Sequence, residues 1–279
     1  AFMSANDFDK HINNEVKVLE EYSWINNCGS KARKKAIQNA ETAYKRFFKG
    51  QSKFPRFKKK SKSDVKLYFP KNNKGDWKVE RHRIIIPTLK NVRLKEYGYI
   101  PVGAKVISGT VSKKANRYYV SVIIDTEIFQ QENINQGIGI DLGIKEFAIC
   151  SNKQTYKNIN KTQKVKKLEK KLLREQRKLS RKYESLKLRN KKEKGEATRQ
   201  NIQKQLVKVQ ILHQRLTNIR TDYINKVVSS VVRNKPQYIA IEDLNVKGMM
   251  KNKHLSKAVV QQKFYEFRTK LTNKCHVLG

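Results

Sequence analysis

The sequence contains little cysteine, little acid and no long apolar run. Its three cysteines, Cys28, Cys150 and Cys275, are an odd number without a CxxC pair, which argues against disulfides and an internal zinc site. No run of about 18 apolar residues is present, so no membrane span is expected, and no signal peptide is visible. We therefore expect a reducing, cytoplasmic setting.

Several catalytic signatures are also missing. The chain has no GxxxxGK[ST] loop and no Ser/His/Asp set. Nucleotide hydrolysis, acyl transfer and redox chemistry therefore have no support in the sequence. His254 and His276 are isolated, and we expect both to be structural or exposed.

Positive charge, in contrast, is abundant. The 279 residues include 63 Lys and Arg against 24 Asp and Glu, a formal net charge of +39. A compact chain with this charge repels itself unless a polyanion neutralises it. Nucleic acid is the expected polyanion, because Lys and Arg bind it by releasing its counterions. A solvated basic surface or a membrane-surface protein is the alternative interpretation.

The pattern of apolar residues predicts an α+β chain. Helical spacing extends over residues 4–49, with Ser30 as the expected cap of a second helix. Short strands with turn signals over residues 64–127, including a hairpin with its turn at 113–116, suggest a small β-barrel. Residues 129–136 are polar and suit a linker.

The remaining chain predicts strands around a long helical insertion. An apolar strand begins at residue 137, and two helical stretches between about 160 and 233 suggest an antiparallel hairpin that bends near Gly195. A second buried strand covers residues 238–242, and a helix is expected from about Ser256 to Asn273. A further strand is expected to begin at about residue 275.

Two acids stand at the ends of buried strands. Asp141 lies in GIGIDLGIK (residues 137–145), and Glu242 lies in YIAIEDLN (residues 238–245). Two-metal phosphodiester hydrolysis needs carboxylates around two cations about 4 Å apart, and Mg²⁺ prefers oxygen ligands. Asp141 is the candidate bridge between two Mg²⁺ ions, and Glu242 is the candidate ligand of one. Alternatively, a strand-end acid binds a sugar or nucleotide, or caps the following turn.

A third acid is normally needed at such a site, and the sequence does not identify one. Asp243 is expected to point to the opposite face of its strand from Glu242, and Asp222 lies within the helical region.

Two basic segments are candidate nucleic-acid surfaces. Between residues 161 and 194, sixteen residues are Lys or Arg and four are acidic, which favours a nucleic-acid-facing helix over a solvated coiled-coil face. Around residues 50–63 aromatics alternate with cations, as in a clamp that holds phosphates and stacks on bases; alternatively, its Phe residues only pack. Lys145 either contacts a phosphate or is a solvated turn lysine. The candidate residues are Lys53, Phe54, Arg56, Phe57, Lys58, Lys59, Lys60, Lys145, Lys167, Lys171, Arg174 and Lys178.

At this point the chain resembles the TnpB family, the OrfB-type transposon-encoded nucleases related to type V CRISPR effectors. The resemblance covers nearly the whole chain and rests on an ordered set of motifs. These are AYKRFF (43–48), FPRFKKK (54–60), SGTVS through YYVS (108–121), GIDLGIK (139–145) and IAIEDLNVKGMMKN (239–252). The last two are similar to the first and second acid-bearing segments of the family's nuclease domain.

The resemblance implies an RNA-guided DNA endonuclease with a particular domain order. It implies a helical recognition region with the basic clamp (1–63), a small β-barrel or wedge domain (64–128), a linker (129–136) and a RuvC-like, RNase H-type domain (137–279) with a helical insertion at about 160–233. The implied partners are a transposon-derived guide RNA and double-stranded target DNA. Asp141 and Glu242 would be the first and second catalytic acids, with Mg²⁺ as cofactor. The implied location is the prokaryotic cytoplasm, in association with the nucleoid.

This chain departs from the family pattern at both ends. The family continues into a four-cysteine Zn²⁺-binding insert and a third catalytic Asp, and it begins with further barrel strands. We therefore expect a chain truncated at both ends, with zinc bound only in the missing C-terminal segment.

Three functions stay open on the sequence alone. The first is guided DNA cleavage, and the second is guided DNA binding without cleavage, as in a transcriptional repressor. The third is structural RNA binding without a DNA target, which leaves Asp141 and Glu242 unexplained.

Overall fold

The computed structural model of the chain describes residues 3–57, 64–127, 132, 136–191 and 199–278. The chain divides into two compact units, Ala1–Glu127 and Ile128–Gly279. The finer domain boundaries expected from the sequence stay a prediction. None of the helices within the described ranges is both long and apolar enough to cross a membrane.

The first unit begins with helical segments, as the apolar spacing of residues 4–49 predicts. The Ser4 hydroxyl accepts a hydrogen bond from the Asp7 N–H and so caps the first helix. Ser30 is the first residue of a helix and not its cap, because Gly29 holds the capping position. The segments are α1 (Ala5–His11), the π-helical turn η1 (Ile12–Val16), the 3-10 helix η2 (Glu20–Asn27) and α2 (Ser30–Phe48).

Two three-stranded antiparallel sheets follow in the same unit. The predicted hairpin is confirmed: Lys114 pairs with Arg117, and the left-handed residues Ala115 and Asn116 form the two-residue turn. One sheet has the order β1-β5-β6 and the other β2-β3-β4. The strands are β1 (Val65–Pro70), β2 (Lys78–Val79), β3 (Arg83–Ile86), β4 (Lys90–Arg93), β5 (Lys105–Lys114) and β6 (Arg117–Asp125).

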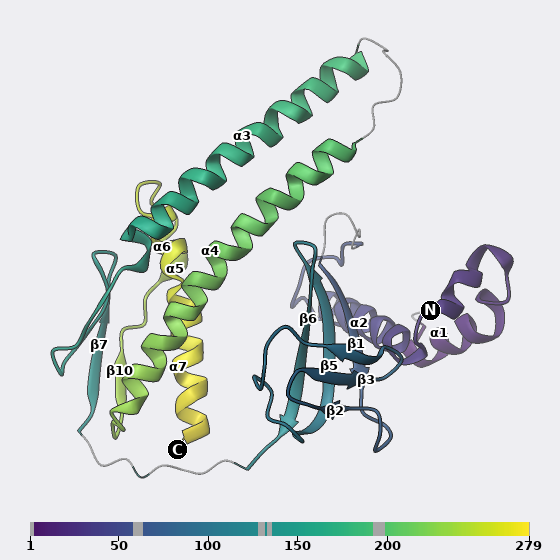
Figure 1. Cartoon of the computed structure of the whole chain (residues 1–279), viewed down its shortest axis with the longest axis horizontal. Coiled ribbons are helices and arrows are strands. Elements are labelled where there is room, and N and C mark those ends of the chain that lie inside the picture. Colours follow the sequence, from purple (N-terminus) through teal and green to yellow (C-terminus); the bar gives the residue numbers. More distant parts are fainter. Residues whose placement is uncertain (1–2, 58–63, 128–131, 133–135, 192–198, 279) are drawn as a thin grey trace. The chain divides into compact units, whose positions relative to one another are not determined.

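The expected small β-barrel is wrong for the described residues. The two sheets share one hydrophobic core, which contains Phe69, Trp77 and Ile84, but no described strand of one sheet pairs with a strand of the other. Closure requires strands long enough to tilt and stagger around a barrel axis. β2, β3 and β4 have two, four and four residues and are too short for this. The result is two open sheets (Figure 1).

The second unit contains a four-stranded sheet with the order β10-β7-β8-β9. β7, β8 and β9 form an antiparallel meander, and β10 returns to pair parallel with β7. The strands are β7 (Ile138–Leu142), β8 (Glu146–Cys150), β9 (Thr155–Lys157) and β10 (Ile239–Ile241). The two acid-bearing segments are therefore neighbouring strands, as the sequence predicts.

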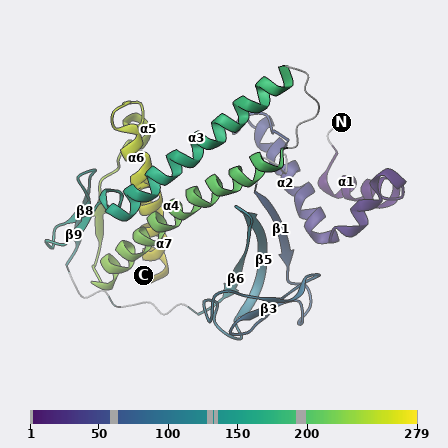
Figure 2. The same ribbon diagram turned by 45° about the horizontal axis from the view of Figure 1, so that its top comes forward.

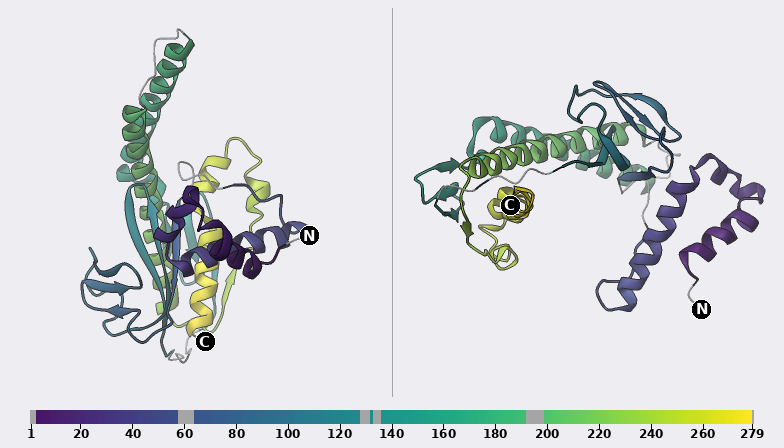
Figure 3. Two further views of the ribbon diagram at one scale, coloured as in Figure 1. Left: turned by 90° about the vertical axis from the view of Figure 1, so that its right-hand side faces the viewer. Right: turned by 90° about the horizontal axis from the view of Figure 1, so that it is seen from below.

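Helices pack on one face of this sheet. Ile138, Ile140 and Leu142 of β7 are buried in the core that also contains Val227 and Phe267 of the flanking helices. Figures 1 and 3 show two of these helices, α4 and α7, running beside β7 and β10. The helical segments are η3 (Ile159–Lys161), α3 (Gln163–Lys191), α4 (Gln200–Arg233), α5 (Val246–Met249), α6 (Ser256–Gln262) and α7 (Phe264–Leu278).

α3 and α4 form the predicted helical hairpin. They run side by side in every view (Figure 2), and Val165 and Leu172 of α3 pack against Val209 and Leu216 of α4. The expected bend at Gly195 lies outside the described residues.

The end of the chain differs from the prediction. One helix and then a strand are expected over residues 256–279. Instead, α6 ends at Gln262, Lys263 adopts a left-handed φ of 56°, and a second helix continues to Leu278. A left-handed residue cannot continue a right-handed helix, which explains the break.

Candidate active site and nucleic-acid surface

Asp141 and Glu242, the predicted metal ligands, lie side by side on the sheet of the second unit. β10 runs parallel to β7 with Ile241 opposite Ile140. Each acid follows that pair by one residue, so both side chains leave the sheet on the same face, opposite to the buried Ile140 and the half-buried Ile241. They line one shallow depression of about 640 Å³.

Small side chains occupy several positions of this face, and the 46% exposed side chain of Ile149 borders the same depression. Gly139, Ala240 and Ser151 line the same depression, and the Ser151 hydroxyl accepts a hydrogen bond of 3.0 Å from the Gly139 N–H. Asp141 and Glu242 are exposed, and neither carboxylate forms a salt bridge or hydrogen bond with another described residue. Both carboxylates therefore present free oxygen ligands to a cation or to a solvated substrate.

The two other acids considered from the sequence do not join this pair. Asp243 forms an ion pair with Arg268 of α7, and Asp222 forms one of 2.7 Å with Lys226 within α4. Within the described ranges, no group of three or more His, Cys, Asp or Glu side chains is placed to hold a metal ion.

The turn after Asp141 is held by side chains that sequence reasoning missed. The carbonyl oxygens of residues 143, 144 and 145 each accept a hydrogen bond from a distant side chain: Gln262 (3.0 Å), Asn158 (2.8 Å) and Lys161 (2.9 Å). Asn158 and Gln262 are 7% and 2% exposed. Burial of such polar side chains is not visible in a local motif.

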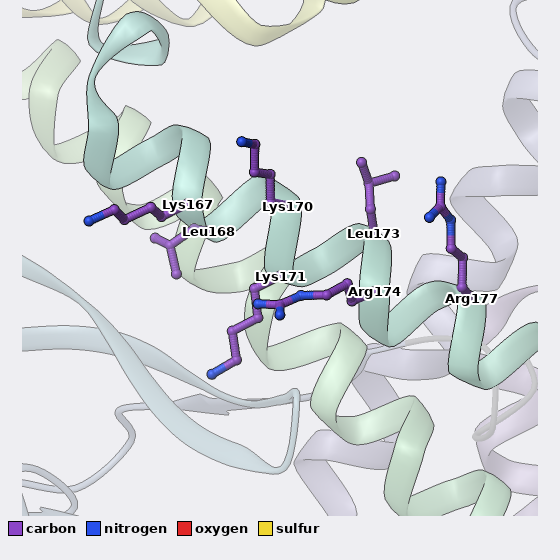
Figure 4. Close-up of a pocket in the computed structure, with 7 residues that line it drawn as sticks. All are labelled: Lys167, Leu168, Lys170, Lys171, Leu173, Arg174 and Arg177. Atoms are coloured by element: carbon purple, nitrogen blue, oxygen red, sulfur yellow. The ribbon is translucent and has the colours of Figure 1, made fainter.

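α3 carries the most strongly basic surface of the second unit. A pocket of about 650 Å³ on this helix is lined by five cations and two leucines: Lys167, Leu168, Lys170, Lys171, Leu173, Arg174 and Arg177. Figure 4 shows Lys170 and Arg177 projecting on one side of α3, while Lys167, Lys171 and Arg174 turn to another. No salt bridge within the described residues neutralises any of the five cations.

The structure thus brings together three of the four cations singled out on this helix and adds two that were missed. Lys167, Lys171 and Arg174 line the pocket, whereas Lys178 pairs with Glu175 at 3.0 Å. Lys145 is exposed on the turn after Asp141.

The predicted aromatic and basic clamp lies in the first unit and is described only in part. Phe54 packs edge-on against Tyr44 and Phe47, with ring centroids 5.8 and 5.3 Å apart. Phe57 is 92% exposed, and Lys53 and Arg56 are exposed beside it. Lys58, Lys59 and Lys60 lie outside the described residues. Phe54 therefore contacts two rings while remaining 61% exposed, and Phe57 presents its ring to solvent.

Comparison with known proteins shows which family the chain resembles. Residues 118–253 match the OrfB_IS605 family model, described as "Probable transposase". A protein of Escherichia coli (strain K12), named as a candidate RNA-guided DNA endonuclease, InsQ, is 32% identical over 276 residues, covering 93% of this chain and 63% of its own length. A Streptomyces pristinaespiralis protein with a corresponding name is 28% identical over 266 residues, covering 95% of this chain and 61% of its own length. Over residues 118–253 the chain is therefore similar to the OrfB_IS605 family.

The OrfB_IS605 match places both acids within the shared region. It extends from β6 to the segment after α5 and includes Asp141, Glu242 and the α3 pocket. The basic segment at residues 51–57 lies outside the matched range. The chain spans a little over three-fifths of the length of the curated relatives, 63% and 61%.

Proposed function

We propose that this chain acts as an RNA-guided DNA endonuclease of the TnpB type. The observation that carries the proposal is the placement of Asp141 and Glu242 on the same open face of neighbouring parallel strands. The names of the two relatives support the same activity.

The topology of the second unit supports a RuvC-like, RNase H-type nuclease fold. An antiparallel meander of three strands is followed by helices and then by a strand parallel to the first. In this arrangement, the first strand and its parallel neighbour deliver one acid each to the same region of the sheet.

The two carboxylates fit divalent metal ions with a preference for oxygen, of which Mg²⁺ is the expected one. Asp141 and Glu242 are the residues that would hold these ions. Bound Mg²⁺ would supply an activated water and stabilise negative charge on the phosphodiester. The small side chains of Gly139 and Ala240 leave space for a sugar-phosphate backbone beside the acids.

The cationic face of α3 is the proposed holding surface for nucleic acid. Its five cations, which form no salt bridge with a described residue, suit the phosphates of a guide RNA, a DNA target or their heteroduplex. A guide would supply sequence selection by base pairing, so the protein needs only shape and charge recognition at this surface. The exposed Phe57 and Arg56 are proposed to contribute a second contact.

The test is guided cleavage of a DNA duplex by the chain with co-expressed RNA from its own locus. We expect Mg²⁺-dependent cutting that Asp141→Ala or Glu242→Ala reduces by at least about 1000-fold, with DNA binding changed less than about 2-fold. Asp222→Ala is the matched control, because it removes an acid already paired with Lys226. Equal cutting by all variants would refute the catalytic assignment.

Guided DNA binding without cleavage is the second candidate. It is favoured by the described residues, which group no third metal-binding side chain with the two acids. The same experiment separates the candidates: guide-dependent retention of the duplex without any cutting would establish the second one. RNA binding without guide-dependent DNA retention would instead indicate a structural RNA-binding role.

A further inference from the structure

A continuous chain of hydrogen bonds joins α3 to the turn that follows Asp141. The Glu169 carboxylate accepts from the Arg220 guanidinium at 2.8 Å, and Arg220 Nε donates to Asn160 Oδ1 at 2.7 Å. Asn160 Nδ2 donates to Gln262 Oε1 at 3.4 Å, and Gln262 Nε2 donates to the Gly143 carbonyl at 3.0 Å. This path of hydrogen bonds connects α3, α4, η3, α6 and the turn between β7 and β8.

The path is built from side chains removed from solvent. Gln262 is 2% exposed, and the side chains of Arg220 and Glu169 are 14% and 22% exposed. Side branches fix it further: Gln261 donates to Glu169 at 2.7 Å, and Asn160 also donates to the Gln261 carbonyl at 3.2 Å. Each amide group therefore has its orientation set by a partner on another element.

We propose that Gln262, Asn160 and Arg220 form a positioning network that fixes the turn at residues 143–145 and thereby the direction of the Asp141 carboxylate. This inference rests on the proposed function, since it assigns these residues to the same metal site. None of the three forms a hydrogen bond with Asp141 or Glu242; each acts through the backbone of the turn.

Stability alone does not account for such a network. A buried polar or ionic cluster adds little or no net stability over a well-packed apolar replacement of similar volume. What it does provide is directional contact, because a misplaced donor leaves a buried carbonyl without a partner. A turn whose three consecutive carbonyls are each bonded to a distant side chain has little freedom to rotate the acid that precedes it.

The network also begins on the helix that carries the cationic pocket. Glu169 lies between Lys167 and Lys170, which line that pocket, and its carboxylate bonds Arg220 and Gln261. Hydrogen bonds therefore connect α3, the helix proposed to hold nucleic acid, to the turn beside the proposed metal site. A small displacement of α3 would reach the turn through four hydrogen bonds.

The test compares two buried glutamines. Gln262→Leu removes the donor to Gly143, and Gln205→Leu removes a similarly buried donor, 5% exposed, that bonds Glu175 within the α3–α4 hairpin. Hydrogen–deuterium exchange is measured in the full chain for peptides covering residues 141–147. We expect about 10-fold faster exchange in this turn for Gln262→Leu and no change there for Gln205→Leu. Equal exchange in the two variants would overturn the inference.

Metal binding and cleavage provide the second measurement. Mn²⁺ titration and the single-turnover rate of guided cleavage are compared at saturating protein. We expect Gln262→Leu to lower the cleavage rate by about 10- to 100-fold and to weaken Mn²⁺ binding, with the Kd for DNA unchanged. If Asp141→Ala has no effect on either measurement, the proposed function fails; if Asp141→Ala abolishes both but Gln262→Leu matches Gln205→Leu, only the positioning role fails.

A milder variant keeps the inference testable if Gln262→Leu does not fold. Arg220→Lys retains the charge beside Glu169 but cannot donate to both Glu169 and Asn160 in the geometry of a guanidinium. We expect an intermediate effect on exchange at residues 143–145 and on cleavage, and unchanged values would count against the network.

Discussion

The cationic pocket on α3 makes a quantitative prediction about salt. Lys167 and Arg177 are ten residues apart on one helix, a span of about 15 Å. Over that length B-DNA carries about nine phosphate charges, more than the five cations that line the pocket. The three cations that turn to one side of α3, Lys167, Lys171 and Arg174, can therefore each meet a phosphate of their own. Every phosphate neutralised contributes about 0.9 to the slope of log Kobs against log salt concentration.

The perturbation is the triple substitution Lys167→Gln, Lys171→Gln and Arg174→Gln. Three lost contacts at about 0.9 each predict that the magnitude of the salt slope falls by about 2.7. The assay is fluorescence anisotropy of a labelled DNA duplex over a series of KCl concentrations.

A matched triple variant separates local contact from overall charge. Lys78, Lys105 and Lys226 each form a salt bridge, with Glu80, Asp125 and Asp222 respectively. Their replacement by Gln lowers the formal net charge of +39 by the same three units, to +36. We expect it to change the slope by less than about 0.5. A slope that falls equally in both triples, or in neither, refutes the assignment of the α3 face.

Three further predictions concern stability and reactivity. Gly109→Ala places a Cβ 2.2 Å from the buried Trp77 ring. It should lower the free energy of unfolding by about 1–3 kcal/mol, measured by urea unfolding with tryptophan fluorescence. Gly75→Ala, with open space around the added Cβ, should lower it less. Burial, with smaller effects from neighbouring groups, raises the pKa of Tyr223 to about 12 from its ordinary value of 10. Between pH 10 and about pH 12 the unfolded form loses this proton and the folded form keeps it, so the free energy of unfolding should fall as the pH rises. Tyr223→Phe should remove the part of this fall that the tyrosine causes. Cys28 is exposed, whereas burial raises the pKa of the Cys150 and Cys275 thiols. Cys28→Ser should therefore abolish the fast phase of the reaction with a disulfide reagent. A fast phase that survives in this variant would contradict the assignment.

The pairing of the two acids could be predicted from the sequence because its signals are local. Asp141 and Glu242 each end an apolar run with strand character, and parallel pairing of two such runs brings their ends together. The hairpin turn at Ala115 and Asn116 is similarly encoded within a few residues.

The two separate sheets in place of the expected barrel, and the helix break near the end of the chain, could not be predicted in the same way. Barrel closure depends on strand length and on pairing between distant strands, and β2 has only two residues. The break at Lys263 has no proline or glycine to mark it. The hydrogen bonds of Gln262 depend on tertiary contacts 119 residues apart.

The shortness of β10 has a consequence for how the position of Glu242 is fixed. β10 has three residues, and among the described residues it pairs only with β7. Side chains alternate between faces along a strand, so a slip of one residue in the pairing of β10 with β7 would turn Glu242 toward the helices. A slip of two residues would restore the face but displace the acid along the strand. Three residue pairs therefore set both the face and the height at which Glu242 stands beside Asp141.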